Sequence, residues 1–220
     1  MKTIVITGGP CSGKTSAIGV LRERLRAADI KAVYVAEAGT DLILEGITPA
    51  SLGSMRAFQT RVAALQIERE ARAQEEALAL EEAQRATGAK AGTETRAEAG
   101  TETRTNQEVL VICDRGICDG AAYLSPEDYA RVLEANRLDA ANLFARYDAV
   151  FCLESTAKIK DGAYTTANNT ARSETPEEAA ALDDRTRAAW EAHPCFHFIA
   201  NEESFAEKAE KLVAGILALA

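Results

Sequence analysis

Three glycines, one lysine and three hydroxyl side chains gather in nine residues near the start of the chain. The segment reads Gly8-Gly9-Pro10-Cys11-Ser12-Gly13-Lys14-Thr15-Ser16. A glycine, four variable residues and then Gly-Lys-Thr form a loop whose backbone N–H groups turn inwards around a phosphate. The lysine then bridges the outer phosphates and the threonine hydroxyl ligates Mg²⁺. The segment therefore predicts binding of ATP or GTP, together with Mg²⁺.

A second candidate for phosphate chemistry is an acidic residue that follows an apolar run. Residues 108–113 are almost continuously apolar, as expected of a strand buried on both faces of a parallel sheet, and Asp114-Arg115-Gly116 comes next. Asp114 is thus placed to hold Mg²⁺ directly or through water, so Thr15 and Asp114 are the predicted metal ligands. The alternative is that Asp114 and Arg115 only begin a turn.

Two further charged residues follow strand-like or loop-like segments. Glu37 ends the second apolar run and is a candidate to accept a proton from a substrate hydroxyl, because a carboxylate in a closed crevice can have its pKa raised towards neutrality. The alternative is an acid that caps a helix. Arg172 lies in a polar segment, 155–175, that is long enough for a functional lid and would bring positive charge to a transferring phosphoryl group. The alternative is a solvated loop arginine.

Phe58 and Gln59 begin a long helix-forming segment. Together with Arg56, a phenyl ring and an amide can stack on a base and recognise its edge, but a Phe-Gln pair is more often a core residue beside a surface residue.

The elements that must position these residues alternate between strand and helix. Strands are expected at 3–6, 32–36, 108–113, 149–153 and 196–200, and helices at 17–28, 51–87, 125 towards 147, 175–192 and 204–219. This order predicts an α/β three-layer sandwich with a five-stranded parallel sheet, as in P-loop NTPases. Ligands bind such sheets beyond the carboxyl ends of the strands, where the glycine-rich loop, Glu37, Asp114 and Asn201 all fall.

Length and charge narrow the classes of function. The 220 residues are interpreted as one domain spanning 1–220, with a flexible polar insertion at about 88–106 that contains two copies of Ala-Gly-Thr-Glu-Thr-Arg, and a lid at about 155–175. A formal charge of -9 argues against a nucleic-acid partner. No apolar run is long enough to span a membrane, and a cytoplasmic protein is expected. The Ala/Glu-rich helix leaves a homo-oligomer open.

With these residues placed, the chain resembles the family of P-loop proteins that groups the nicotinamide riboside kinase domain with the TRP-channel translocation-defect protein. The resemblance covers nearly the whole chain. It rests on the glycine-rich loop, Glu37-Ala38-Gly39-Thr40, Cys113-Asp114-Arg115-Gly116 with Asp119-Gly120-Ala121-Ala122-Tyr123, and the segment from Asn168 to Glu174 that holds Arg172. The stretch from Thr175 to Asn201 also looks like the translocation-defect protein. A Glu after the second strand and an Asp-Arg after the third also look like deoxynucleoside and thymidylate kinases. That likeness implies that Glu37 is a base and that Arg115 contacts the phosphate or hydroxyl of a small-molecule acceptor.

Three functions are compatible with these motifs. The first is a small-molecule kinase that transfers the γ-phosphoryl group to a nucleoside, a nucleotide or a related hydroxyl compound. The second is a nucleotide-dependent switch that binds a protein or a phosphoinositide, as the translocation-defect protein implies. The third is a P-loop protein that has lost its chemistry, although Lys14, Thr15 and Asp114 are all intact.

Overall fold

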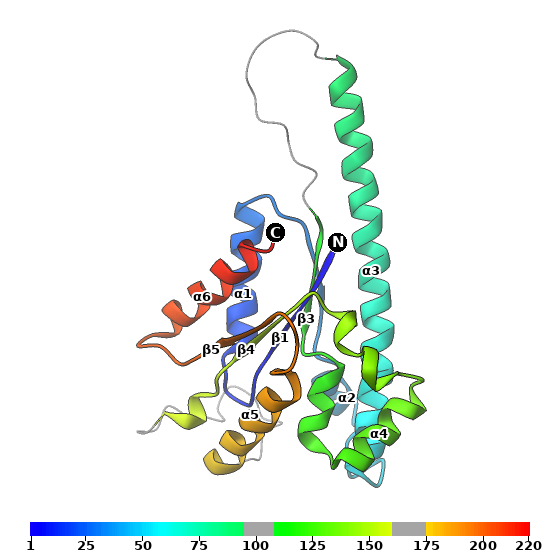
Figure 1. Ribbon diagram of the computed structural model, residues 1–220, viewed down its shortest axis with the longest axis vertical. Coiled ribbons are helices and arrows are strands. Elements are labelled where there is room, and N and C mark those ends of the chain that lie inside the picture. The colour runs from blue at the N-terminus through cyan, green and yellow to red at the C-terminus, as the bar shows by residue number, and fades with distance from the viewer. Residues whose placement is uncertain (95–107, 160–174) are drawn as a thin grey trace.

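A five-stranded parallel sheet forms the centre of the molecule (Figure 1). The structure is a computed structural model that describes residues 1–94, 108–159 and 175–220. The strands lie in the order β2-β3-β1-β4-β5. They are β1 (Lys2–Thr7), β2 (Ala32–Val35), β3 (Leu110–Asp114), β4 (Ala149–Leu153) and β5 (Phe196–Ile199). The five predicted strands are confirmed, with bounds that shift by one or two residues.

Alternating side chains of the strands build two apolar cores, one on each face of the sheet. On one face, Ile4 and Ile6 pack with helices α1 (Lys14–Ala27) and α6 (Phe205–Leu217). On the other face, Val5 packs in a cluster with residues of α3 (Met55–Glu94), α4 (Pro126–Ala135) and α5 (Pro176–Trp190). The predicted α/β three-layer sandwich is therefore confirmed.

The register of the central strands brings the predicted chemical residues to one edge of the sheet. Ile6 of β1 lies opposite Asp114 of β3, and Thr7 lies opposite Cys152 of β4. Because all the strands are parallel, their carboxyl ends meet at this edge. The glycine-rich loop leaves β1 here and runs directly into α1.

The longest helix differs from its prediction at both ends. The Ala/Glu-rich segment is predicted to be helical over 51–87, whereas α3 runs from Met55 to Glu94. Residues 48–54 form turns, in which the backbone N–H groups of Thr48 and Ser51 bond to each other's hydroxyls. At the far end the helix continues through Gly88, because propagation of an existing helix through Ala-rich sequence costs little. The predicted polar insertion is thus helical over 88–94, and its remainder lies outside the described residues.

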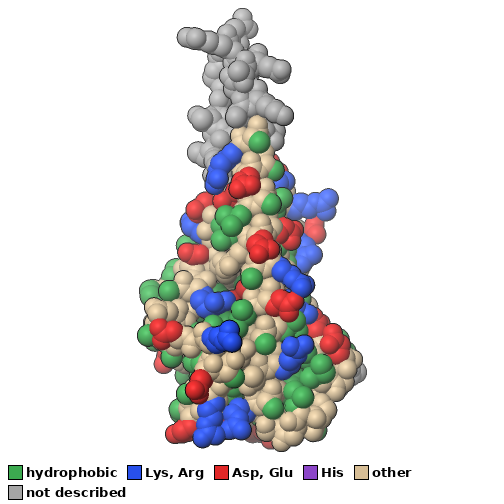
Figure 2. All heavy atoms as spheres, turned by 90° about the vertical axis from the view of Figure 1, so that its right-hand side faces the viewer, with side chains coloured by type: hydrophobic (Ala, Val, Ile, Leu, Met, Phe, Trp, Pro, Cys, Tyr) green, Lys and Arg blue, Asp and Glu red, His purple; other side chains and the backbone are tan. Residues whose placement is uncertain are grey.

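Along its outer side, α3 carries charges of both signs. Figure 2 shows Lys and Arg side chains interspersed with Asp and Glu on this face. Arg72 pairs with Glu68 one helical turn away, and Arg85 pairs with Glu81 in the same manner. In Figure 1 the helix extends well past the sheet on the side of the chain termini.

The segment after β3 folds into short elements. A helix was expected from residue 125 towards 147, but α4 ends at Ala135. The helix ends where Arg137 adopts a left-handed backbone (φ 56). The side-chain amide of Asn136, the C-cap residue, donates to the Val132 carbonyl at 2.9 Å and to the Thr60 carbonyl of α3 at 3.3 Å. The remaining short elements are α2 (Ala38–Leu44), η1 (Ile117–Tyr123), η2 (Ala140–Asn142), η3 (Phe144–Arg146) and η4 (Thr156–Lys158). Within the three described ranges, no helix combines the length and the apolar character that crossing a membrane requires.

Candidate functional site

The glycine-rich loop can close only because two of its positions lack a side chain. Gly8 and Gly13 have positive φ angles of 141° and 84°, which L side chains rarely adopt. A Cβ on Gly8 would lie 2.1 Å from the Leu153 carbonyl oxygen, and one on Gly13 would lie 2.8 Å from the Phe205 ring. The loop is therefore pressed between β4 and α6, with its backbone turned around the space in front of α1.

Lys14 folds back across this loop. Its side chain donates to the Gly8 carbonyl at 3.1 Å and lies 3.5 Å from the Ser12 hydroxyl. Burial lowers the pKa of Lys14, and the nearby Arg115 cation lowers it further, whereas Asp114 and Glu37 act in the opposite direction. A buried ammonium whose contacts here are a carbonyl and a hydroxyl is well suited to bind a phosphate anion.

Asp114 lies at the end of β3 as predicted. Its Oδ1 atom is buried and has no hydrogen-bond partner among the residues that the structure describes. Burial raises the pKa of Asp114, Lys14 opposes this effect, and Glu37 adds to it. A buried carboxylate oxygen without a partner is unfavourable, and a divalent cation with its water ligands would relieve it. Thr15, the other predicted Mg²⁺ ligand, lies at the start of α1 and is exposed. A Mg²⁺ site formed by Thr15 and Asp114 stays a prediction.

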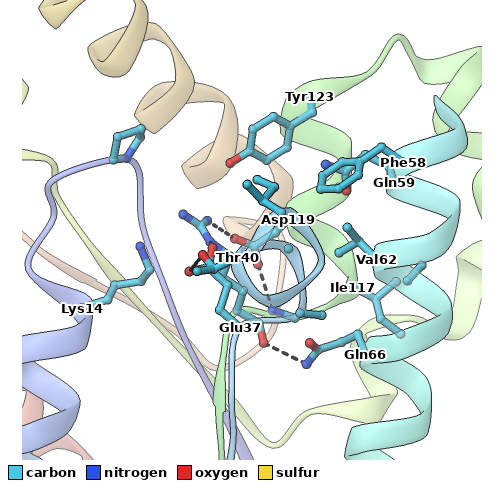
Figure 3. A pocket seen from close by; sticks show the side chains of 18 of the residues that line it. Lys14, Glu37, Thr40, Phe58, Gln59, Val62, Gln66, Ile117, Asp119 and Tyr123 are labelled. Carbon is cyan, nitrogen blue, oxygen red and sulfur yellow. Dashed lines mark hydrogen bonds and ion pairs between the residues drawn. The ribbon is translucent and has the colours of Figure 1, made fainter. Parts of the chain in front are cut away.

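Arg115 joins two carboxylates. It donates from Nε to Glu37 Oε1 at 2.7 Å and from Nη1 to Asp119 Oδ1 at 2.8 Å. Its backbone is left-handed, with φ 70, which is uncommon for a residue other than glycine and here turns the side chain back towards β2. Thr40 donates to the second oxygen of Glu37 at 3.0 Å. Glu37, Arg115 and Asp119 thus form one charged cluster at the strand ends. Figure 3 shows Glu37 and Asp119 close together in the cavity wall.

The pKa expected for Glu37 is wrong in direction. We expected a closed crevice to raise it towards neutrality. Burial does act in that direction, but the Arg115 and Lys14 cations and the hydrogen bonds from Arg115 and Thr40 outweigh it and lower the pKa of Glu37 to about 2. Glu37 is therefore an ionised hydrogen-bond acceptor across the physiological range.

Asp119 belongs to a motif on which the family resemblance rests, but no role in the site was predicted for it from the sequence. Its Oδ1 also accepts from the Thr7 hydroxyl at 2.5 Å, and its Oδ2 accepts from the Gly116 N–H and the Trp190 indole N–H, each at 3.0 Å. Its position three residues after Gly116, at the start of a helical turn, is a capping signal that the sequence does contain. The long-range contacts with Thr7 and Trp190 carry no local signal.

A single cavity of about 1000 Å³ extends from the glycine-rich loop to α3. Lys14 and Glu37 line it near the loop, and Phe58, Gln59 and Tyr123 line its far end (Figure 3). The side chains of that end are mostly aromatic and apolar, with two amides. They come from α3, η1 and α4: Phe58, Gln59, Val62, Gln66, Ile117, Tyr123, Tyr129 and Val132.

Several predicted site residues do not line this cavity. Gly8, Gly9 and Asp114 lie beside it, at the strand ends, without lining it. Asn201 does not line it, because its amide donates to the Ser155 carbonyl at 3.0 Å and accepts from the Lys208 ammonium at 2.9 Å. Arg172, with most of the predicted lid, lies outside the described residues. The loop residues from Pro10 to Ser16 line the cavity together with Glu37 and Arg115.

The fold and the phosphate loop define a nucleotide-binding P-loop protein. The chain matches the family described as "AAA domain" over residues 3–85 and 79–208, so it belongs to that family. Proteins of this P-loop class generally bind nucleotide with Mg²⁺. No curated protein matches the chain.

Replacing Lys14 tests the phosphate loop directly. We expect Lys14→Ala to weaken binding of Mg·ATP or Mg·GTP by about 100-fold or more, because a buried charge-assisted contact with phosphate is lost. Isothermal titration calorimetry measures the affinity, and thermal unfolding checks that the fold is intact. Lys31→Ala, at a side chain that is 52% exposed, is the matched control. Unchanged affinity in Lys14→Ala would mean that the loop does not bind the phosphates.

The Glu37 cluster predicts a pH dependence of stability. The pKa of Glu37 falls from an ordinary 4.5 to about 2 on folding, so its contribution to the free energy of unfolding is present above the unfolded pKa and is lost as the pH falls towards the folded pKa. We expect the stability difference between wild type and Glu37→Gln to be largest above about pH 5 and to shrink towards about pH 2.5. Urea unfolding at a series of pH values measures it. An equal difference at every pH would show that Arg115 does not hold Glu37 ionised.

Proposed function

We propose that the protein is a small-molecule kinase that transfers the γ-phosphoryl group of ATP or GTP to a hydroxyl of a flat, uncharged compound such as a nucleoside. The observation that supports this most strongly is the shape of the cavity. One continuous space holds a phosphate loop at one end, an aromatic and amide-lined compartment at the other, and an ionised carboxylate near the loop. A hydrolase or a switch needs no second compartment of this kind.

The donor phosphates occupy the loop end. Backbone N–H groups of the loop and the Lys14 ammonium hold the phosphate oxygens, and the positive end of α1 adds to their stabilisation. Thr15 and Asp114 would hold Mg²⁺, which neutralises charge that develops between the β- and γ-phosphates.

Glu37 orients the acceptor. Its carboxylate accepts a hydrogen bond from the acceptor hydroxyl, whose oxygen forms a bond to the γ-phosphorus while the bond from that phosphorus to the β,γ-bridging oxygen breaks. Because the pKa of Glu37 is about 2, the carboxylate holds the hydroxyl in place and the proton leaves on the product phosphate. Phosphoryl transfer passes through a loose transition state, in which positioning matters more than early removal of the proton.

The charges near the acceptor favour an uncharged compound. Among the described residues that line this part of the cavity, Arg115 is the cation, and it is already paired with Glu37 and Asp119. A substrate that carries its own phosphate would meet two carboxylates and one engaged guanidinium. The ring of such a compound would instead lie near Phe58 and Tyr123, with the Gln59 amide available to its polar edge.

The finer resemblance to the nicotinamide riboside kinase domain and to deoxynucleoside kinases agrees with this proposal. Arg172 would add a cation to the transferring group when substrate is bound, and this role is based on the sequence alone. The translocation-defect protein suggests the second candidate, a nucleotide-dependent switch. The kinase assay separates the two.

The proposal is tested by phosphate transfer from γ-labelled ATP and GTP to a panel of nucleosides, nucleoside monophosphates and other hydroxyl compounds. We expect transfer to an uncharged acceptor, and Glu37→Gln should lower kcat by about 100-fold with nucleotide affinity retained, because only the acceptor is misplaced. Glu45→Gln, an exposed residue at the end of α2, is the matched control. Tight nucleotide binding without transfer to any acceptor would contradict the kinase and favour the switch.

A further inference from the structure

A buried lysine lies behind the phosphate loop, on the side away from the cavity. Lys208 belongs to α6 and is only 3% exposed. Its ammonium donates to the Ser12 carbonyl at 3.0 Å, to Asn201 Oδ1 at 2.9 Å and to the Glu154 carbonyl. These three contacts use its three N–H donors, and each acceptor is uncharged.

The charge of this lysine has no carboxylate in contact with it. Within the described ranges, Lys208 takes part in no ion pair of 4.0 Å or less. The Glu154 carboxylate instead accepts from the Asn201 N–H. The Asp183 carboxylate accepts hydrogen bonds from the Gly9 and Ser155 N–H groups and forms an ion pair with Lys158. A buried cation without a counter-ion is costly in the free chain, and the cost falls when an anion binds nearby.

The Ser12 carbonyl links this charge to the cavity. The same peptide unit carries the Gly13 N–H, which belongs to the donors that surround phosphate in a loop of this type. A cation on the carbonyl oxygen draws electron density towards that oxygen, which makes the N–H of the peptide a stronger donor. The contact also fixes the orientation of the peptide plane before a ligand arrives.

We propose that Lys208 is a positioning residue for the triphosphate: it strengthens phosphate binding from behind by fixing and polarising the Ser12–Gly13 peptide. Asp183 fixes the other end of the loop, where it accepts from the Gly9 N–H at 2.7 Å. The two helices α5 and α6 therefore hold the loop from outside the cavity. This inference depends on nucleotide binding and not on the identity of the acceptor.

The contacts of Asn201 in the structure differ from the nucleotide contact that the sequence predicts. It was expected to contact the nucleotide because it follows β5. Its amide bridges the Ser155 carbonyl and the Lys208 ammonium, so it orients the lysine.

Binding measurements on the full chain separate this role from simple attachment of α6 to the loop. Lys208→Gln keeps a donor and removes the charge, and Lys208→Met removes both. Lys211→Gln is the matched control on the same helix, where the side chain is 59% exposed and paired with Glu202. We expect both Lys208 variants to bind Mg·ATP and Mg·pyrophosphate about tenfold more weakly than wild type, because one charge-assisted contact is lost, and the Lys211 variant to be unchanged. Wild-type affinity in Lys208→Gln would overturn the proposal.

The pH profile gives a second readout, which a purely mechanical role would not produce. Burial lowers the pKa of Lys208 to about 8, with Glu154, Asp183 and Cys152 acting to raise it and Lys14 to lower it. The charged form is lost as the pH rises through this value, so wild-type affinity for Mg·ATP should fall between about pH 7.5 and 9.5. We expect Lys208→Gln to show a smaller fall over this range. A flat wild-type profile would contradict the proposal even if neither variant folds.

Discussion

The ion pairs of Arg115 with Glu37 and Asp119 hold the site together. The three residues come from different stretches of backbone: Glu37 follows β2, Arg115 follows β3, and Asp119 lies in η1. Asp119 extends the cluster to Thr7 of β1 and Trp190 of α5. Since the parallel register already aligns these strand ends, one guanidinium suffices to fix the wall of the cavity opposite the phosphate loop.

The distribution of charge around that cluster divides the cavity into two parts. On the loop side, the Lys14 ammonium is buried against neutral oxygens, and Asp114 Oδ1 has no hydrogen-bond partner among the described residues. Both groups would gain from a phosphate and a divalent cation. On the other side, the guanidinium is already paired and the walls are aromatic, apolar or amide. We therefore propose an anion at one end and a flat uncharged ring at the other.

The sequence predicts the parts of the site that depend on local pattern. The glycine-rich loop, Asp114 after an apolar strand and Glu37 after another could be identified because parallel sheets collect strand ends at one edge. The roles of Asp119 and Lys208 could not be identified in this way, because they depend on long-range contacts. Asp119 contacts Thr7 across a sequence separation of 112, and Lys208 contacts Ser12 across a separation of 196. The predicted direction of the Glu37 pKa shift was wrong for the same reason. Burial of Glu37 can be anticipated from the sequence, but the pairing of Glu37 with Arg115 depends on the left-handed backbone of Arg115.

In the proposed kinase, donor and acceptor share one cavity and lie on either side of Glu37. A compound that joins adenosine or guanosine to a second nucleoside through an oligophosphate chain tests this most directly, with its affinity measured by calorimetry beside that of ATP and GTP. We expect the linked compound to bind about 100-fold more tightly than the nucleotide alone, since both compartments are filled at once. We also expect Phe58→Ala to remove most of that gain while leaving nucleotide affinity unchanged. An affinity no greater than that of the nucleotide would contradict a second, acceptor-binding compartment.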